Sequence, residues 1–196
     1  MIRVICRTGC LATLLAFIGQ PAAGQHEAPD ALRVRRDVCP FECCTYGPWV
    51  ARNAIPVYAA ERDTTEVLLV IAPGERFEGV TGHVYIDRFG IVDVRRPVAQ
   101  IPGYDQTTVF QPGDTLVLLD YVGEGFQNVW YRDSIMEVEA FWWSPDDTTG
   151  VDPAVIQGVL RVPPIEAWWV KVRTPDGQVG WIDMSTARMD GIDACG

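Results

Sequence analysis

The chain is short of the residues on which most hydrolase mechanisms depend. Among its 196 residues there are two histidines, a single lysine and three serines. No G-x-S-x-G, H-E-x-x-H or G-x-x-x-x-G-K-[ST] motif occurs, so the sequence lacks the signatures of serine hydrolases, zinc proteases and phosphate-binding loops. The sequence therefore predicts no catalytic residues, and an unrecognised hydrolase that uses some of the 26 acidic residues is the weakest alternative.

Basic charge and long apolar segments are also scarce. Acidic residues outnumber Lys and Arg by 26 to 16, which gives a net charge of −10. Nucleic-acid-binding proteins need a basic face, so nucleic acid is excluded as a partner. After the N-terminal region no run approaches the ~20 apolar residues of a membrane-spanning helix, so we expect no membrane span. No cofactor and no metal site are predicted.

The N-terminus has the pattern of an export signal. Arg3 and Arg7 precede a short apolar run at residues 11–18, and the small residues 22–24 follow it. This order of charged, apolar and small residues is typical of a secretory signal peptide. We therefore expect residues 1–24 to be removed, residues 25–38 to form a flexible leader, and the protein to be secreted or periplasmic.

The cysteines agree with export. Four remain after the predicted signal peptide: Cys39, Cys43, Cys44 and Cys195. An even number in an exported chain indicates two disulfides. Because a bond between the neighbouring Cys43 and Cys44 would be strained, Cys195 is expected to pair with one of them and Cys39 with the other. A four-cysteine metal site is the alternative, and the isolation of Cys195 disfavours it.

Short segments of period two, separated by turns rich in Gly and Pro, predict an all-β protein. In the last of these segments, Trp168 and the two valines that follow at alternate positions share one face. Trp169, Lys171 and Arg173 share the opposite face. Turns of β-hairpins are expected at residues 87–90 and 174–177. The only helix expected is a short one at residues 152–160.

Two copies of a Pro-Gly-acid turn, at residues 73–75 and 112–114, each lead into an apolar strand pattern. We interpret this as a degenerate tandem repeat of one small β unit. The first unit is expected to span residues 39–100. The second is expected to span residues 101–196, with an insertion at about 129–164.

The closing segment of the chain, residues 169–182, reads WVKVRTPDGQVGWI. It resembles the final hairpin of bacterial SH3 (SH3b) domains, and residues 112–125 resemble the strand that precedes it. The first unit is more loosely similar, with the sequence IPVY at residues 55–58 and Gly90-Ile91 in place of the usual Gly-Trp pair. The resemblance implies two tandem SH3-like β-barrels and a non-catalytic, exported binding module. Because some SH3b domains hold enzymes to cell-wall peptidoglycan, it also implies an envelope peptide or glycan as ligand.

Aromatic residues that alternate with core positions are the candidate ligand contacts. We expect five residues to lie outside the core and to line a groove for an extended peptide or glycan stem: Tyr58, Tyr131, Trp169, Lys171 and Arg173. The alternative is that the rings cover the edge of the core. His83 is expected to be a partly exposed strand residue without a catalytic role. A second function class is a disulfide-stapled assembly protein of the envelope that takes no small ligand.

The export pattern predicts a cleaved N-terminus. Intact-mass measurement of the exported protein should find Gln25, or a close neighbour, as the first residue. A mature protein that retains Met1 would contradict the signal peptide.

Overall fold

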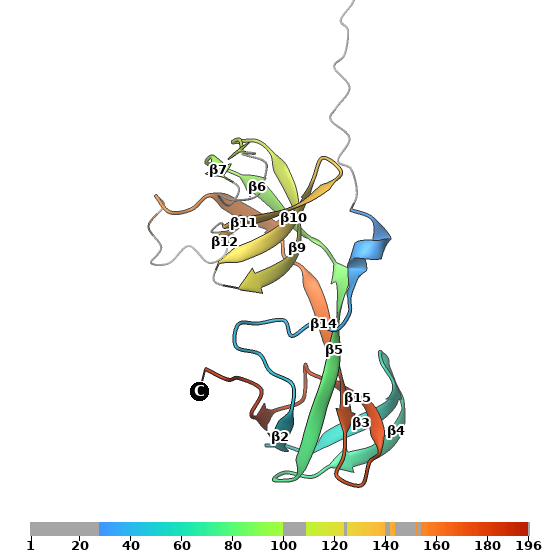
Figure 1. Cartoon of the computed structure of the whole chain (residues 1–196). Coiled ribbons are helices and arrows are strands. Elements are labelled where there is room, and N and C mark those ends of the chain that lie inside the picture. Colours follow the sequence, from blue (N-terminus) through green and yellow to red (C-terminus); the bar gives the residue numbers. More distant parts are fainter. Residues whose placement is uncertain are drawn as a thin grey trace, which may run out of the picture.

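A computed structural model describes residues 28–99, 109–123, 125–139, 142–143, 152 and 154–195. This part of the chain is all-β, as the sequence predicts, and its one helical element is the short 3-10 helix η1 (Asp30–Arg33). None of the described segments is a helix long and apolar enough to cross a membrane. The strands form two lobes, which the long strands β5 (Arg76–Arg88) and β14 (Ile165–Arg173) connect (Figure 1). The predicted signal peptide, residues 1–24, lies outside the described residues.

The first sheet is a curled, half-barrel arrangement built from both ends of the chain (Figure 1). Its strand order is β16 (Met189–Asp190), β2 (Pro48–Ala51), β5, β14, β15 (Val179–Asp183), β3 (Ile55–Ala60) and β4 (Asp63–Ile71), with β1 (Val34–Arg35) paired to β5.

The concave side of this sheet holds the barrel core, whose buried members include Trp49, Phe77, Val170, Val172 and Ile182. The large ring of Trp49 is fully buried at the centre. A β-carbon at Gly79 would lie 2.5 Å from that ring, so this strand position requires glycine. Val170 and Val172, which alternate along β14, are both fully buried in this core, so they define the buried side of the strand, as the sequence predicts.

The second sheet has the order β11 (Ser134–Glu139), β10 (Phe126–Tyr131), β9 (Thr115–Gly123), β6 (Gly90–Val94), β13 (Gly158–Val162) and β12 (Trp142–Trp143). The strands β7 (Val98–Ala99) and β8 (Val109–Phe110) form a separate two-stranded sheet, and in the chain they follow β6 and precede β9. The fully buried side chains of this lobe include Val92, Phe110, Leu116, Val129 and Val138. Each lobe therefore has its own apolar core.

The pairing of the closing hairpin differs from the sequential arrangement expected from the sequence. The sequence predicts that the hairpin β14–β15 belongs to the second unit, but β14 pairs with β5 over nine residue pairs and β15 pairs with β3. The second sheet is thus inserted, in sequence, between two halves of the first. The physical reason is that Val170 and Val172 of β14 and Ile182 of β15 complete the core around Trp49.

Two local predictions are also wrong, and one is confirmed. The turn at residues 174–177 closes the β14–β15 hairpin, with Gly177 at a φ of 87°. At residues 87–90, in contrast, the chain passes from the first sheet to the second, and β5 does not pair with β6. The helix expected at 152–160 is absent from its described residues. Asp152 accepts a hydrogen bond from the Ala154 amide in a turn, and β13 follows.

The described part of the predicted leader is packed rather than flexible. Ala28 is buried, and β1 pairs with residues 84 and 85 of β5. The Val38 amide then donates to the Gly82 carbonyl at 3.0 Å. Ala28 and Leu32 join an apolar cluster with Ile86, Phe89 and Leu119, where the two lobes meet. Burial of these side chains holds the segment in place, which its polar composition did not reveal.

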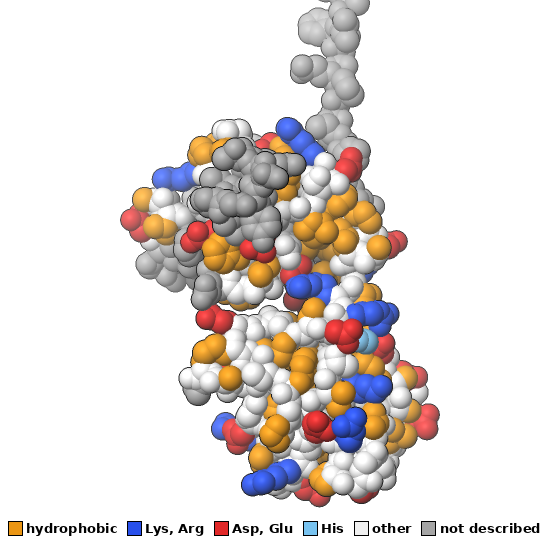
Figure 2. Space-filling model, viewed as in Figure 1, with side chains coloured by type: hydrophobic (Ala, Val, Ile, Leu, Met, Phe, Trp, Pro, Cys, Tyr) orange, Lys and Arg blue, Asp and Glu red, His pale blue; other side chains and the backbone are white. Residues whose placement is uncertain are grey.

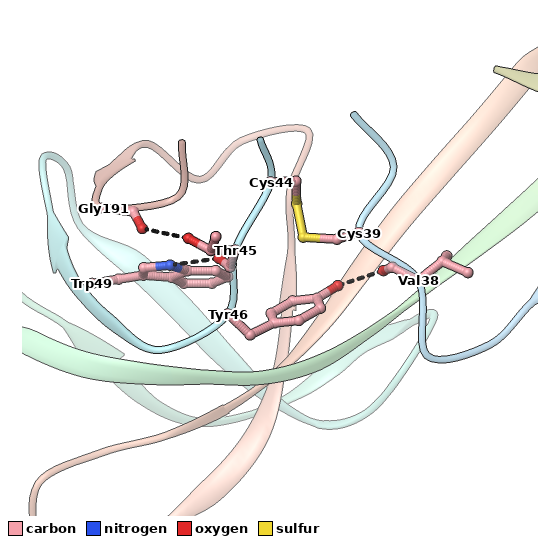
Figure 3. The surroundings of a disulfide bond; sticks show 7 residues. All are labelled: Val38, Cys39, Cys44, Thr45, Tyr46, Trp49 and Gly191. Atoms are coloured by element: carbon pink, nitrogen blue, oxygen red, sulfur yellow. Dashed lines mark hydrogen bonds between the residues drawn. A yellow bond between two sulfur atoms is a disulfide. The ribbon is translucent and has the colours of Figure 1, made fainter. Parts of the chain in front are cut away.

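The disulfides are Cys39–Cys44 and Cys43–Cys195, with Cα–Cα distances of 5.5 and 5.6 Å. This is one of the two pairings left open by the sequence, and it indicates a non-reducing compartment. The first disulfide lies beside Tyr46, whose hydroxyl donates to the Val38 carbonyl (Figure 3). Close by, Thr45 contacts the C-terminal segment through the Gly191 carbonyl, and Trp49 Nε1 donates to the Thr45 carbonyl (Figure 3).

Cys195→Ala tests the contribution of this C-terminal clasp. The Cys43–Cys195 bond joins residues 152 positions apart, so its loss should lower the free energy of unfolding by about 2–5 kcal/mol and the Tm by several degrees. Calorimetry measures both effects, and thiol titration should find the freed thiol of Cys43. The double variant Cys43→Ala/Cys195→Ala, which has no stray thiol, should lose the same stability. An unchanged Tm in both variants would contradict the clasp.

Candidate functional site

A continuous row of side chains crosses five strands on the outer face of the first sheet, the side opposite the Trp49 core. Residues that pair directly across antiparallel strands share a face. The register pairs Thr81 of β5 with Lys171, Lys171 with Trp181, Trp181 with Tyr58, and Tyr58 with Val67 of β4. We call these five residues the outer row: Thr81, Lys171, Trp181, Tyr58 and Val67.

Lys171 is the only lysine of the chain, and it stands second in this row, between Thr81 and Trp181. Its Nζ atom lies 6.0 Å from the centroid of the Trp181 ring, within reach of a cation–π interaction. Among the described residues it has no acidic partner, whereas Arg173, on the same face, pairs with Glu78 at 2.7 Å. Lys171 is therefore a free cation next to an aromatic ring, on a strongly acidic protein.

Two arginines near the outer row are neutralised locally. Arg62 pairs with Asp87 at 2.8 Å, and Arg36 lies 3.7 Å from Glu61. Figure 2 shows the result as basic and acidic side chains interleaved over the lower lobe, without a large region of one sign. Surface pairs of this kind contribute little to stability, but they leave Lys171 as a distinct feature of the outer face.

The position of Trp169 corrects one expectation. It lies on the same face as Lys171, as the alternation predicts, but its side chain is buried, with 5% of its surface exposed. Its ring packs against Tyr58, with 5.8 Å between the ring centroids. The prediction of an exposed indole is wrong because Tyr58 of β3, two strands away in the sheet, supplies a ring that packs against it. Trp169 therefore supports the ring of Tyr58 and does not offer a free surface.

A polar cluster lies next to the outer row. His83, opposite Trp169 in the register, is buried rather than partly exposed, and its ring centroid lies 5.0 Å from that of Trp181. Glu61 Oε2 accepts a hydrogen bond from Nδ1 of His83 at 2.5 Å. Burial and the hydrogen bond to Glu61 raise the pKa of Tyr85 to about 12. The hydrogen bond to Glu61 therefore holds the ring of His83 in place beside Trp181, at the edge of the outer row.

The same cluster sets the ionisation of Glu61. Partial burial acts to raise the pKa of this carboxyl. Hydrogen bonds from Tyr85 and His83, together with the charges of His83 and Arg36, outweigh burial and lower the pKa below its ordinary value of 4.5. Glu61 is therefore held as a carboxylate that anchors its neighbours.

The cluster is not arranged for nucleophilic catalysis within the described residues. Nδ1 of His83 is committed to Glu61, and Nε2 lies 4.0 Å from a carboxylate oxygen of Asp37. A triad needs a nucleophile in hydrogen-bond reach of the base. The four described cysteines are all in disulfides and offer no thiol. The geometry of this cluster suits a structural role, in which His83 positions the Trp181 side chain of the outer row.

Two of the predicted ligand residues lie away from this row. Tyr131 belongs to β10 of the second sheet, where its ring packs 5.1 Å from that of Phe110. It is therefore not brought together with Tyr58 and Lys171. Arg173 lies on the outer face but borders an open hollow of about 410 Å³, which Pro48, Arg76 and Pro175 also line.

Sequence reasoning missed Trp181 and Val67 as members of the row. The sequence predicts that Trp181 belongs to the closing hairpin, but it does not predict that Trp181 pairs with Tyr58 in another strand. The register that sets it beside Tyr58 joins segments far apart in the chain, and nothing in their local patterns specifies this pairing.

Comparison with protein-family models, with curated proteins and with solved structures found no significant match to this chain. The outer row and the cluster beside it are therefore the features from which a function is inferred.

Glu61→Gln tests the cluster through its pH dependence. A carboxyl whose pKa is lowered by folding stabilises the protein above its unfolded pKa, and this contribution disappears as pH falls through the folded-state value. At pH 7 the variant should lose about 1 kcal/mol, or roughly 2–4 °C in Tm. At about pH 3 the two proteins should melt closely together. Glu66→Gln, on exposed β4, is the control; a pH-independent difference for Glu61→Gln would contradict the assigned role.

Proposed function

We propose that the chain is an exported, non-catalytic SH3b-like binding protein that takes a peptide or glycan ligand of the cell envelope on the outer face of its first sheet. The observation that carries this proposal is Lys171 in β14, which has no acidic partner among the described residues and lies next to the ring of Trp181. A solvent-accessible cation beside aromatic rings is suited to an extended ligand with an anionic group.

The strand pairing supports a single SH3b-like unit in place of two complete tandem units. The segment that resembles the start of an SH3b domain, residues 55–58, lies in β3. The segment that resembles its end forms β14 and β15, and Trp181 of β15 pairs with Tyr58 of β3. The second sheet is then a large insertion between these two halves, longer than the 129–164 insertion expected from the sequence.

Export to the envelope is supported from two sides. The N-terminal pattern of basic, apolar and small residues is that of a signal peptide. The two disulfides indicate a non-reducing compartment, such as the periplasm or the cell exterior.

The chemistry of the outer row favours peptidoglycan stem peptides as the ligand class. Such peptides carry free carboxylates beside small apolar side chains. A carboxylate would pair with Lys171, and the apolar parts would lie on the faces of Trp181 and Tyr58, where the sheet also exposes Val67. Lys171 is the cation of this face that lies beside the rings of the row, so it is the expected charge contact.

Lys171→Glu and Trp181→Ala test the site by calorimetric titration with a synthetic stem peptide and by sedimentation with purified peptidoglycan. Each variant should weaken binding at least tenfold, which corresponds to about 1.4 kcal/mol. Added salt should weaken binding of the unaltered protein, because the contact is ionic. Trp169→Ala is unsuitable as a probe, because removal of this buried ring costs about 3–5 kcal/mol of stability.

Tyr131→Ala in the second sheet is the matched control, since Tyr131 is also a half-buried aromatic residue. It should bind as the unaltered protein does. Equal losses for Tyr131→Ala and Lys171→Glu would place the ligand elsewhere. Failure of the unaltered protein to bind any stem peptide or peptidoglycan fraction would overturn the proposed function.

A further inference from the structure

Strand β4 forms an exposed edge of the first sheet. Among the described strands it pairs only with β3, so the backbone groups on its other side have no strand partner there. Three of its apolar side chains are largely exposed: Val67 by 49%, Leu68 by 43% and Val70 by 54%. Soluble proteins usually protect such an edge with lysine, proline or inward-facing charge, and residues 67–71 contain none of these.

The apolar part of this edge reads the same in both directions. Residues 67–70 are Val, Leu, Leu and Val. A register shift next to Val57 and Tyr58 changes the normal alternation of faces. Val67 lies opposite Tyr58 and Val70 opposite Pro56, so both valines belong to the outer face.

The two leucines belong to the core side. Leu69 lies opposite the buried Val57. A β-carbon at Gly180 would lie 3.2 Å from Leu68 Cδ1 and 2.5 Å from Val57 Cγ1, which places Leu68 on that side as well. The order of faces is therefore outer, core, core, outer.

We infer that β4 pairs with β4 of a second copy of this chain, antiparallel and about a two-fold axis, with Val67 opposite Val70 and Leu68 opposite Leu69 of the partner. Antiparallel partners must share a face. Strict alternation would set outer residues against core-side residues in this register, whereas the shifted order matches outer with outer and core side with core side. A two-fold contact needs such self-complementarity, and another partner chain would have to reproduce both the residues and the shift.

Charge is compatible with this pairing. Glu66 of one copy lies opposite Ile71 of the other, so acidic residues do not face each other along the apolar segment. The net charge of −10 repels the copies at long range, but that repulsion is screened beyond about 8 Å at physiological ionic strength. The dimer should therefore become stronger when salt is added, opposite to the salt effect expected for ligand binding at Lys171.

The symmetry has a consequence that rests on the proposed function. Antiparallel edge pairing requires a two-fold axis perpendicular to the joined sheet, and that axis leaves both outer faces on the same side. The two Lys171–Trp181 sites would then face one polymeric ligand together. Binding to intact peptidoglycan should exceed binding to a single stem peptide through avidity.

Sedimentation velocity of the full exported chain tests the dimer without any ligand. The unaltered protein should sediment as a dimer at high concentration, and Val67→Lys or Leu68→Lys should raise the dimer dissociation constant at least tenfold. Ile135→Lys is the matched control, since Ile135 is equally exposed, by 51%, on edge strand β11 of the second sheet. A monomer at every concentration and salt level overturns the inference, as does a dimer that only Ile135→Lys disrupts.

Cysteine pairing tests the register. A mixture of the Val67→Cys and Val70→Cys variants should form an intermolecular disulfide on mild oxidation, because directly opposed residues lie within bonding range. Each variant alone should cross-link poorly, since its own cysteines would be three positions out of register. Equal cross-linking in all three samples would contradict the register. If the Leu68→Lys variant, whose altered side chain lies on the core side and outside the outer row, is monomeric and still binds a single stem peptide, the dimer and the ligand site are separate properties. Loss of peptide binding alone would overturn only the proposed function.

Discussion

The antiparallel pairing of β5 with β14 is the constraint on which the rest of the structure depends. It extends over nine residue pairs and joins parts of the chain that are separated by the entire second sheet. On its core side it brings Val170 and Val172 against Trp49 and Phe77. On its outer side it sets Lys171 opposite Thr81 and Trp169 opposite His83. The same ladder therefore creates both the barrel core and the candidate binding face.

Contacts of the chain ends stabilise the edges of this arrangement. Cys43–Cys195 attaches the C-terminal segment to the residues that precede β2, and β16 pairs with β2 at the edge of the sheet. At the other end, the buried carboxylate of Asp120 in β9 pairs with Arg35 in β1, so the former leader bridges the lobes. Burial raises the pKa of Asp120 despite this ion pair. Covalent and polar contacts thus fix the ends of the chain, whereas apolar burial forms the two centres.

The local predictions succeeded where a short-range rule decides the outcome. The faces of β14 follow from alternation at Val170 and Lys171, and the turn at Gly177 follows from its Pro-Asp-Gly sequence. The disulfide partners were narrowed to two alternatives by the strain of a bond between neighbouring cysteines. The predictions failed where the structure of a segment depends on the distant segment with which it pairs or packs. The burial of Trp169 depends on Tyr58 in β3, and the strand at Gly158 depends on its pairing with Val94. Repetition of a turn motif was mistaken for sequential units because pattern alone does not identify strand partners.

Nuclear magnetic resonance of the full chain offers the most direct test of this account. If β5 pairs with β14, Hα–Hα contacts should link residues 79–86 with residues 166–172 at alternate positions, and further contacts should link Trp181 with Tyr58. Cross-strand contacts of β14 with the strands of the second sheet, and none with β5, would show that the closing hairpin belongs to a separate unit. The outer face would then not exist in the form described.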